Sequence, residues 1–290
     1  MSSPGDSAIG GQLRALRQRF RLTQLELADA VGISTRHLSF LETGRSQPSR
    51  AMVLRFAESL QLSLRARNAL LVTAGFAPIY PERPLSDPDL TAARRAVDVL
   101  LKGHEPYPAF AVDRHWNLIA SNGGFLPFLK GIDFSRFTSP INVLSFTLHP
   151  LGLGPRLANH GQWRSHVLAK LRHQFELSRD PVLGALLEEL RGYPAPSAAL
   201  GVSDDEGRFR GFAIPFQLQI EDGVLSFFST TTLFGTPLEV TLAELSLECF
   251  YPADDFTVQA LHRARSTRTQ ASNLKENDPA DPPRLALPPK

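Results

Sequence analysis

The chain has 290 residues, of which 42% are hydrophobic, and this is enough for two domains with apolar cores. Its single cysteine excludes an intramolecular disulfide, and no apolar run reaches the roughly 18 residues of a membrane-spanning helix. The formal net charge is only +2, yet residues 1–79 carry ten Arg against five acidic residues, whereas the remainder carries −3. A basic N-terminal domain followed by a mildly acidic remainder is typical of a protein whose N-terminal domain, here called the head, binds DNA. Because the chain also starts with a polar stretch rather than a signal peptide, we expect a cytoplasmic protein.

Residues 22–50 predict two short helices joined by a tight glycine turn. Thr23 and Glu26 fit a capping box at the start of the first helix, and Gly32 suits the left-handed residue that ends it. Ser34 fits the cap of the second helix. The apolar side of the first helix is expected to consist of Leu25, Leu27, Ala28 and Val31. This arrangement is a helix-turn-helix, which lays its second helix in the major groove of DNA.

The same stretch resembles the Xre-type (phage-repressor-like) helix-turn-helix family. The resemblance rests on Thr23-Gln24, Leu27-Ala28, Val31-Gly32-Ile33-Ser34, Leu38-Ser39 and Leu41-Glu42-Thr43-Gly44. It implies a five-helix DNA-binding domain over residues 9–77. The further helices of that domain are expected at residues 9–20, 50–60 and 64–74.

The family pattern assigns DNA contacts to the two helices and to the loop that follows them. The expected DNA-binding residues are Thr23, Gln24, Ser34, Thr35, Arg36, His37, Ser39, Arg45 and Arg50. In the family a Gln at the position of Gln24 holds a phosphate, and Arg36 suits either a bidentate guanine contact or a phosphate. Phe40 replaces a polar base-reader that many relatives carry, which favours apolar packing there. Glu42 is expected to be structural and to pair locally.

A proline-rich linker at residues 78–88 would space this head from a second domain at residues 89–254. The expected helices of the second domain lie at 89–102, after Asn122, and at 142–148, 159–177 and 181–190. Its expected strands lie at 109–113, 117–121, 212–220, 223–232 and 242–251. The polar, proline-rich tail at 264–290 is predicted to be disordered.

The order of two strands, several helices and three strands resembles a PAS-like sensor. Together with the head, the motifs Ala74-Gly75-Phe76-Ala77-Pro78, His104-Glu105-Pro106-Tyr107-Pro108, Asp113-Arg114-His115-Trp116-Asn117-Leu118 and Asn122 resemble the MmyB-like branch of Xre regulators. The predicted fold class is therefore α+β: an N-terminal all-α five-helix bundle, then a PAS-like five-stranded antiparallel sheet with helices. The resemblance implies a ligand-binding domain, and fatty-acid-like ligands are associated with the group.

An apolar cavity between the sheet and its helices would suit such a ligand. The chain has 19 Phe, many of them in the second domain, although each also fits a plain core. The expected ligand-binding residues are Trp116, Asn122, Phe125, Asn142, His149, Trp163, His166, Phe216 and Phe227. Arg172 is a further polar candidate for the ligand head group. Asn122 is equally suited to capping its helix, and His166 to the edge of the core.

The sequence carries no nucleophile elbow, no P-loop and no dinucleotide-binding glycine motif, so we expect no enzymatic activity. No cofactor is expected other than a bound fatty acid or a similar apolar ligand. The expected partners are double-stranded operator DNA, this ligand and a second copy of the chain, with no membrane. Two heads would occupy half-sites about 34 Å apart. The alternative is a second domain that serves only dimerisation or a protein partner, without a ligand.

Overall fold

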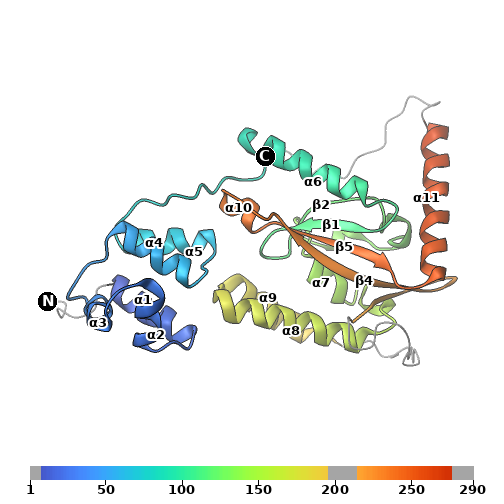
Figure 1. The fold of residues 1–290 in the computed structure, drawn as a ribbon. Coiled ribbons are helices and arrows are strands. Elements are labelled where there is room, and N and C mark those ends of the chain that lie inside the picture. Colours follow the sequence, from blue (N-terminus) through green and yellow to red (C-terminus); the bar gives the residue numbers. More distant parts are fainter. Residues whose placement is uncertain (1–7, 195–213, 276–290) are drawn as a thin grey trace. The chain divides into compact units, whose positions relative to one another are not determined.

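The computed structural model describes residues 8–194 and 214–275, and the chain divides into two compact units (Figure 1). The first unit runs through Thr91 and also contains Phe234–Glu244, a stretch that we call the β4–β5 segment. The second unit contains Ala92–Leu233 and the chain from Leu245 onward. The chain therefore leaves the second unit between two of its strands and returns to it.

The first unit contains the five predicted helices. They are α1 (Ala8–Arg19), α2 (Gln24–Val31), α3 (Thr35–Glu42), α4 (Arg50–Ser59) and α5 (Leu64–Thr73). A Ser or Thr side chain accepts a backbone N–H at the start of α2, α3, α4 and α5, which is the preferred N-cap chemistry. Gly32 ends α2 in the left-handed region at φ 72°. Leu13, Leu27, Leu38 and Phe56 are fully buried between these helices.

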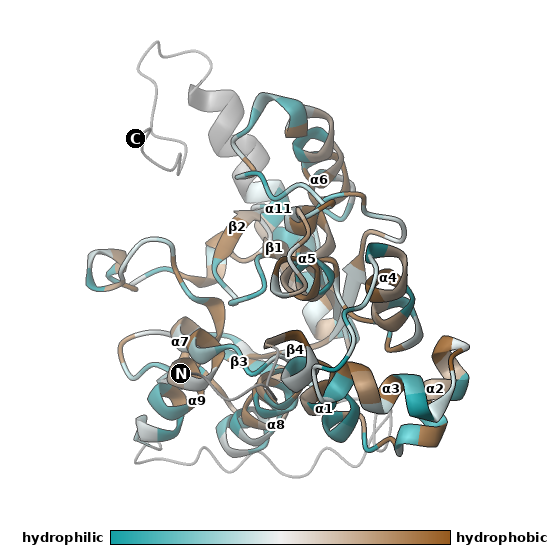
Figure 2. Cartoon of the chain, turned by 90° about the vertical axis from the view of Figure 1, so that its left-hand side faces the viewer, coloured by the Kyte–Doolittle hydropathy of each residue, from teal (hydrophilic) through white to brown (hydrophobic). Residues whose placement is uncertain are grey.

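One predicted core position of this bundle is wrong. The side chain of Leu25 is 59% exposed, whereas Leu27, Ala28 and Val31 are buried as expected. Residues two apart on a helix do not share a face, so burial of Leu27 turns Leu25 outward. Figure 2 shows hydrophilic and hydrophobic stretches alternating along α2 and α3, as in helices that bury one side.

The linker is held against α5 by side-chain contacts. The amide of Asn68 donates to the backbone oxygen of Tyr80 at 2.7 Å and accepts the N–H groups of Ile79 and Tyr80. The linker ends in a 3-10 turn at Pro88–Leu90, and α6 (Thr91–Gly103) follows.

The β4–β5 segment forms a short helix, α10 (Val240–Ala243), where the sequence predicts the start of the last strand. The N–H of Val240 donates to the backbone oxygen of Pro81 at 2.9 Å, and the hydroxyl of Thr241 donates to that of Arg83 at 2.6 Å. These bonds attach the segment to the linker, so the last strand begins later than predicted, at Ser246.

The second unit is built on the predicted antiparallel sheet. Its strands are β1 (Ala109–Val112), β2 (Leu118–Ser121), β3 (Phe216–Ile220), β4 (Gly223–Leu233) and β5 (Ser246–Pro252). The spatial order is β2-β1-β5-β4-β3, and every neighbouring pair is antiparallel. The α+β fold class with a PAS-like sheet is therefore confirmed. Residues 212 and 213, where the sequence predicts the start of the third strand, lie outside the described residues.

Helices cover this sheet. Figure 1 shows α7 (Val143–Leu148), α8 (His160–Ser178) and α9 (Pro181–Gly192) on one side of the sheet and α6 on the other. Short 3-10 turns occur at Leu126–Phe128, Phe134–Arg136 and Gly154–Arg156. The first of these replaces the longer helix predicted after Asn122.

The predicted disordered tail needs a correction as well. Helix α11 spans Asp255–Lys275, so residues 264–275 are helical. Residues 255–275 contain neither Pro nor Gly, and the prolines of the tail all come later, which explains why a helix reaches this far. Residues 276–290 lie outside the described residues.

Candidate nucleic-acid interface and ligand cavity

The outer face of α3 carries an aromatic ring between two arginines. Phe40 is half-buried, and the guanidinium carbons of Arg36 and Arg45 lie 5.4 and 5.9 Å from the centre of its ring. Among the described residues, no carboxylate pairs with either arginine. Phe40 therefore packs against these side chains through cation–π contacts rather than in the core. The ring orders two cations where the sequence predicts contacts with DNA.

Glu42 fixes α3 to the other helices. Its side chain is buried and accepts hydrogen bonds from Arg17 Nε at 2.7 Å and from Gln24 Nε2 at 2.8 Å. Burial alone would raise the pKa of Glu42, but the bonds from Arg17 and Gln24 and the charge of Arg17 hold it below its ordinary value. Glu42 thus has the expected structural role, although its partners lie on α1 and α2 rather than nearby in the chain. The phosphate contact of Gln24 stays a prediction.

The other predicted DNA-binding residues lie along α2, α3 and the start of α4. Thr23 and Ser34 accept backbone N–H groups as helix caps, so both help to orient helix N-termini. Half-buried positions on α3 are Thr35, His37 and Ser39, and Arg50 is exposed at the first turn of α4. The contacts of all nine residues with DNA remain predictions.

We expect Arg36→Ala to weaken binding to a selected operator by about 1–3 kcal/mol and to relax preference at one base pair. The loss would follow from a bidentate contact with a guanine edge. Fluorescence anisotropy with operator and scrambled duplexes checks this, with Arg172→Ala on α8 as the charge-matched control. An equal loss on both duplexes would assign Arg36 to a phosphate instead.

The second unit contains a cavity of about 150 Å³ between the sheet and the helices α7 and α8. Six predicted ligand-binding residues line it: Trp116, Asn122, Phe125, Trp163, His166 and Phe216. Most of the remaining lining is apolar and includes Phe110, Phe134, Phe146 and Phe250. Leu126 also lines the cavity and is 49% exposed.

Asn122 lines the cavity and also has a structural role, because its amide connects α6, the start of β1 and the following turn. Its amide nitrogen donates to the backbone oxygens of Leu101 and Tyr107, and its oxygen accepts the N–H groups of Ala109 and Gly124. These four bonds use the donors and the acceptor of the amide. The helix that Asn122 was expected to cap does not form, since the 3-10 turn after it begins at Leu126 without a side-chain cap, so contact of Asn122 with a ligand stays a prediction.

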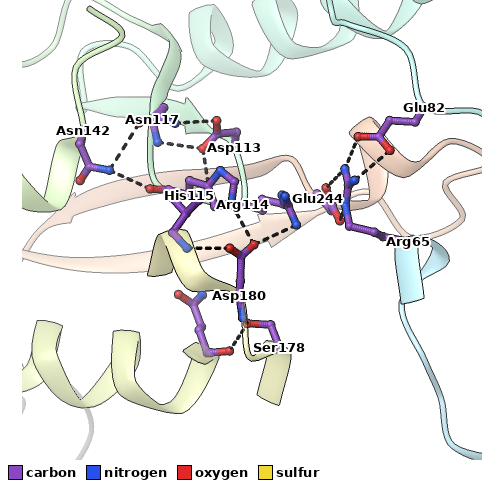
Figure 3. Close-up of polar contacts among 12 residues, drawn as sticks. Arg65, Glu82, Asp113, Arg114, His115, Asn117, Asn142, Ser178, Asp180 and Glu244 are labelled. Atoms are coloured by element: carbon purple, nitrogen blue, oxygen red, sulfur yellow. Dashed lines mark hydrogen bonds and ion pairs between the residues drawn. The ribbon is translucent and has the colours of Figure 1, made fainter. Parts of the chain in front are cut away.

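Three predicted lining residues do not line the cavity. Asn142 caps α7, because its oxygen accepts the N–H of Ser145 at 3.1 Å and its nitrogen donates to the backbone of His115 (Figure 3). His149 accepts the N–H of Leu151 on Nδ1, and Phe227 is fully buried in the core. The further candidate Arg172 is also misplaced, since its side chain is 65% exposed and pairs with Glu176.

Sequence reasoning missed the charged pair in the cavity. Lys170 and Glu248 both line it, and Lys170 Nζ lies 3.1 Å from Glu248 Oε1. Lys170 could have been found, because it stands seven residues after Trp163 and four after His166, on the same face of α8. Glu248 could not, because in a strand that alternates with apolar residues a Glu indicates the solvent side.

A second ion cluster holds the β4–β5 segment to α5 and the linker. Arg65 lies between two carboxylates: its Nε donates to Glu244 Oε1 at 2.7 Å, and its Nη1 donates to Glu82 Oε2 at 2.8 Å (Figure 3). Arg83 pairs with Glu239 of the same segment at 3.2 Å. The linker, α5 and the β4–β5 segment are therefore joined by charged contacts as well as by backbone hydrogen bonds.

A capped helix-turn-helix bundle and a separate cavity-bearing sheet domain define a helix-turn-helix transcription regulator with a ligand-binding domain. The family described as "Helix-turn-helix" matches residues 13–66, and that described as "MmyB-like transcription regulator ligand binding domain" matches residues 93–264. The chain belongs to the family of MmyB-like transcription regulators.

Among solved structures, the clp gene regulator ClgR from C. glutamicum is 32% identical to the chain. That match covers 24% of this chain and 86% of the other, with a TM-score of 0.21. No curated protein matches the chain significantly. Within the described residues, none of the helices combines the length and the apolar character needed to cross a bilayer.

Proposed function

We propose that the operator occupancy of this regulator is modulated by a small apolar, fatty-acid-like ligand in the cavity of the second unit. By fatty-acid-like we mean a hydrocarbon chain with one polar end. The observation that supports the proposal most is the apolar cavity between the sheet and α7 and α8, in a chain whose head is built to bind DNA. Apolar cavities of about this volume hold a benzene-sized molecule, so a longer chain would need to extend beyond the cavity, for example past the partly exposed lining residue Leu126.

The route from cavity to head is proposed to be the β4–β5 segment. Ser229 on β4 and Glu248 and Phe250 on β5 line the cavity, and the same two strands run directly into this segment. The segment groups with the DNA-binding unit and is bonded to its linker. A ligand that binds one arrangement of β4 and β5 better would therefore shift the position of the linker and the affinity for DNA.

The regulator is proposed to bind as a homodimer to double-stranded operator DNA, with heads on half-sites about 34 Å apart. The affinity should fall steeply with salt, because counterions compete for the phosphates. Two copies of the linker would set the separation of the heads, so a ligand-driven change at the linker would alter the fit to both half-sites together.

Mass spectrometry of the organic extract from the purified, denatured protein tests the ligand. We expect an apolar compound near one equivalent per chain. An empty extract, together with no change in Tm across a panel of apolar compounds, would instead support a second domain that binds only a protein partner.

We expect Ser229→Phe to remove the extractable compound and the ligand response while leaving DNA binding intact. Ser229 is half-buried and lines the cavity, so a phenyl ring there would occupy the ligand's space. Its exposed neighbour on the same strand gives the matched control, Thr230→Phe. Retention of the compound by Ser229→Phe would show that β4 does not border the bound ligand.

A further inference from the structure

The polar end of the cavity is a compact ionic cluster. Glu248 is 4% exposed, and its Oε1 accepts hydrogen bonds from Lys170 Nζ at 3.1 Å and from Thr231 Oγ1 at 2.8 Å. The ammonium of Lys170 also lies 4.4 Å from the centre of the Trp116 ring. Trp116 Nε1 donates a hydrogen bond to Gln174 Oε1 at 2.8 Å, so the indole ring that Lys170 contacts is itself held in place. Contacts within the protein therefore hold the cluster in place.

The charges of this cluster balance. The ionisable residues among the cavity lining are His166, Lys170 and Glu248. Burial and the charge of Lys170 lower the pKa of His166 below its ordinary value, against a smaller opposing effect of Glu248, so the neutral imidazole predominates at pH 7. One ammonium then faces one carboxylate, and the polar end carries no net charge.

A balanced pair discriminates against charged ligands of either sign. A ligand carboxylate would place two anions against Lys170, and a ligand ammonium would place two cations against Glu248. The Glu248 side chain is 5% exposed and that of Lys170 is 34% exposed, so an extra charge here would lose much of its water without gaining a full partner. An uncharged hydroxyl or amide, by contrast, both accepts from an ammonium and donates to a carboxylate.

We propose that the cavity selects an apolar molecule with an uncharged hydrogen-bonding head group, held by Lys170 and Glu248. The inference rests on the proposed ligand function and narrows its ligand class: the bound compound ends in a hydroxyl or amide rather than in a carboxylate anion.

Three probes of equal chain length test this on the full-length protein at pH 7: 1-decanol below its solubility limit, and decanoate and decylammonium below their critical micelle concentrations. Both tryptophans of the chain, Trp116 and Trp163, line the cavity, so intrinsic fluorescence reports directly on occupancy. We expect 1-decanol to bind about tenfold or more tightly than either charged probe, as for an uncompensated charge in an apolar site.

Two variants should change the preference in opposite directions. Glu248→Gln leaves Lys170 without its counter-ion, so decanoate should gain affinity over decylammonium. Lys170→Gln leaves Glu248 alone and should favour decylammonium. The control is Glu176→Gln, which removes a charge from the outer face of α8, where the side chain is 52% exposed; it should leave all three affinities unchanged.

The result that overturns the inference is tight binding of decanoate to the wild type, equal to 1-decanol and unaltered by Glu248→Gln. The proposal of an apolar ligand would then remain, but the inferred preference for an uncharged head group would be wrong. Binding of none of the three probes would contradict the proposed ligand function and this inference with it. The comparison of probes on the wild type needs no variant, so a variant that fails to fold does not remove the test.

Discussion

Glu42→Ala should destabilise the DNA-binding unit by about 3–5 kcal/mol, the range for breaking a buried ion pair by removing one partner. The side chain of Arg17 is only 13% exposed and directs Nε and Nη2 at the two carboxylate oxygens. Without Glu42 the guanidinium charge of Arg17 would remain partly buried and would have lost its main partner. The amide of Gln24 would lose its acceptor too, so α3 would no longer be fixed to α1 and α2, and operator affinity should fall with stability.

Urea denaturation of the full chain, followed by far-UV circular dichroism, measures this loss. Asp29→Ala on the exposed side of α2 is the matched control and should change the free energy of unfolding little. The pKa of Glu42 lies below its ordinary value in the folded state, so its stabilising contribution is present above about pH 4.3. That contribution is lost as the pH falls through the lowered pKa. A Glu42→Ala protein as stable as the control would show that the contacts of Glu42 contribute little.

Arg65→Ala should abolish the ligand response while leaving ligand binding unchanged. Arg65 joins Glu244 of the β4–β5 segment to Glu82 of the linker, whereas the residues that line the cavity are elsewhere in the chain. If this joint transmits the signal, its removal should eliminate a coupling that is typically about 1–3 kcal/mol, or 5–150-fold in affinity.

The charge-matched control is Arg172→Ala, which removes an arginine from the exposed surface of α8 and leaves the contacts of Arg65 with Glu82 and Glu244 intact. Operator affinity, measured with and without saturating 1-decanol, should respond in the control and not in Arg65→Ala. Tryptophan fluorescence confirms that both variants bind the probe. A full response in Arg65→Ala would exclude this cluster from the coupling.

Local rules predicted the head well. The capping residues Thr23 and Ser34 and the left-handed Gly32 act within a few residues of their own positions, so the sequence alone indicates where α2 and α3 begin and end. The exposure of Leu25 was missed because the first helix was assigned more apolar positions than one face of a two-turn helix can bury. The tie between Glu42 and Arg17 spans 25 residues and has no local signal.

The cavity was predicted less completely, for physical reasons that its residues illustrate. Aromatic residues such as Phe125 and Trp163 line it as expected, because large apolar side chains on inward faces reach any space between layers. Asn142 was misplaced because a polar residue just before a helix serves as its cap. Glu248 was missed because it shares the cavity-facing side of β5 with Phe250, whereas the apolar Leu247 that alternates with it is buried on the opposite side.

Helices α10 and α11 also departed from expectation. Residues 242 and 243, where the last strand was expected to begin, belong to a helix that long-range bonds attach to the linker. Residues 264–275 were grouped with a proline-rich tail, although the prolines of that tail come only later.

The central claim is that occupancy of the cavity alters binding to DNA. The direct measurement is the affinity for an operator selected from random duplexes by the full-length protein, titrated against 1-decanol in the wild type and in Ser229→Phe. We expect the wild-type affinity to change at least about fivefold as the probe saturates the tryptophan signal, and the variant affinity to stay constant. An unchanged wild-type affinity at full occupancy of the cavity would contradict the claim.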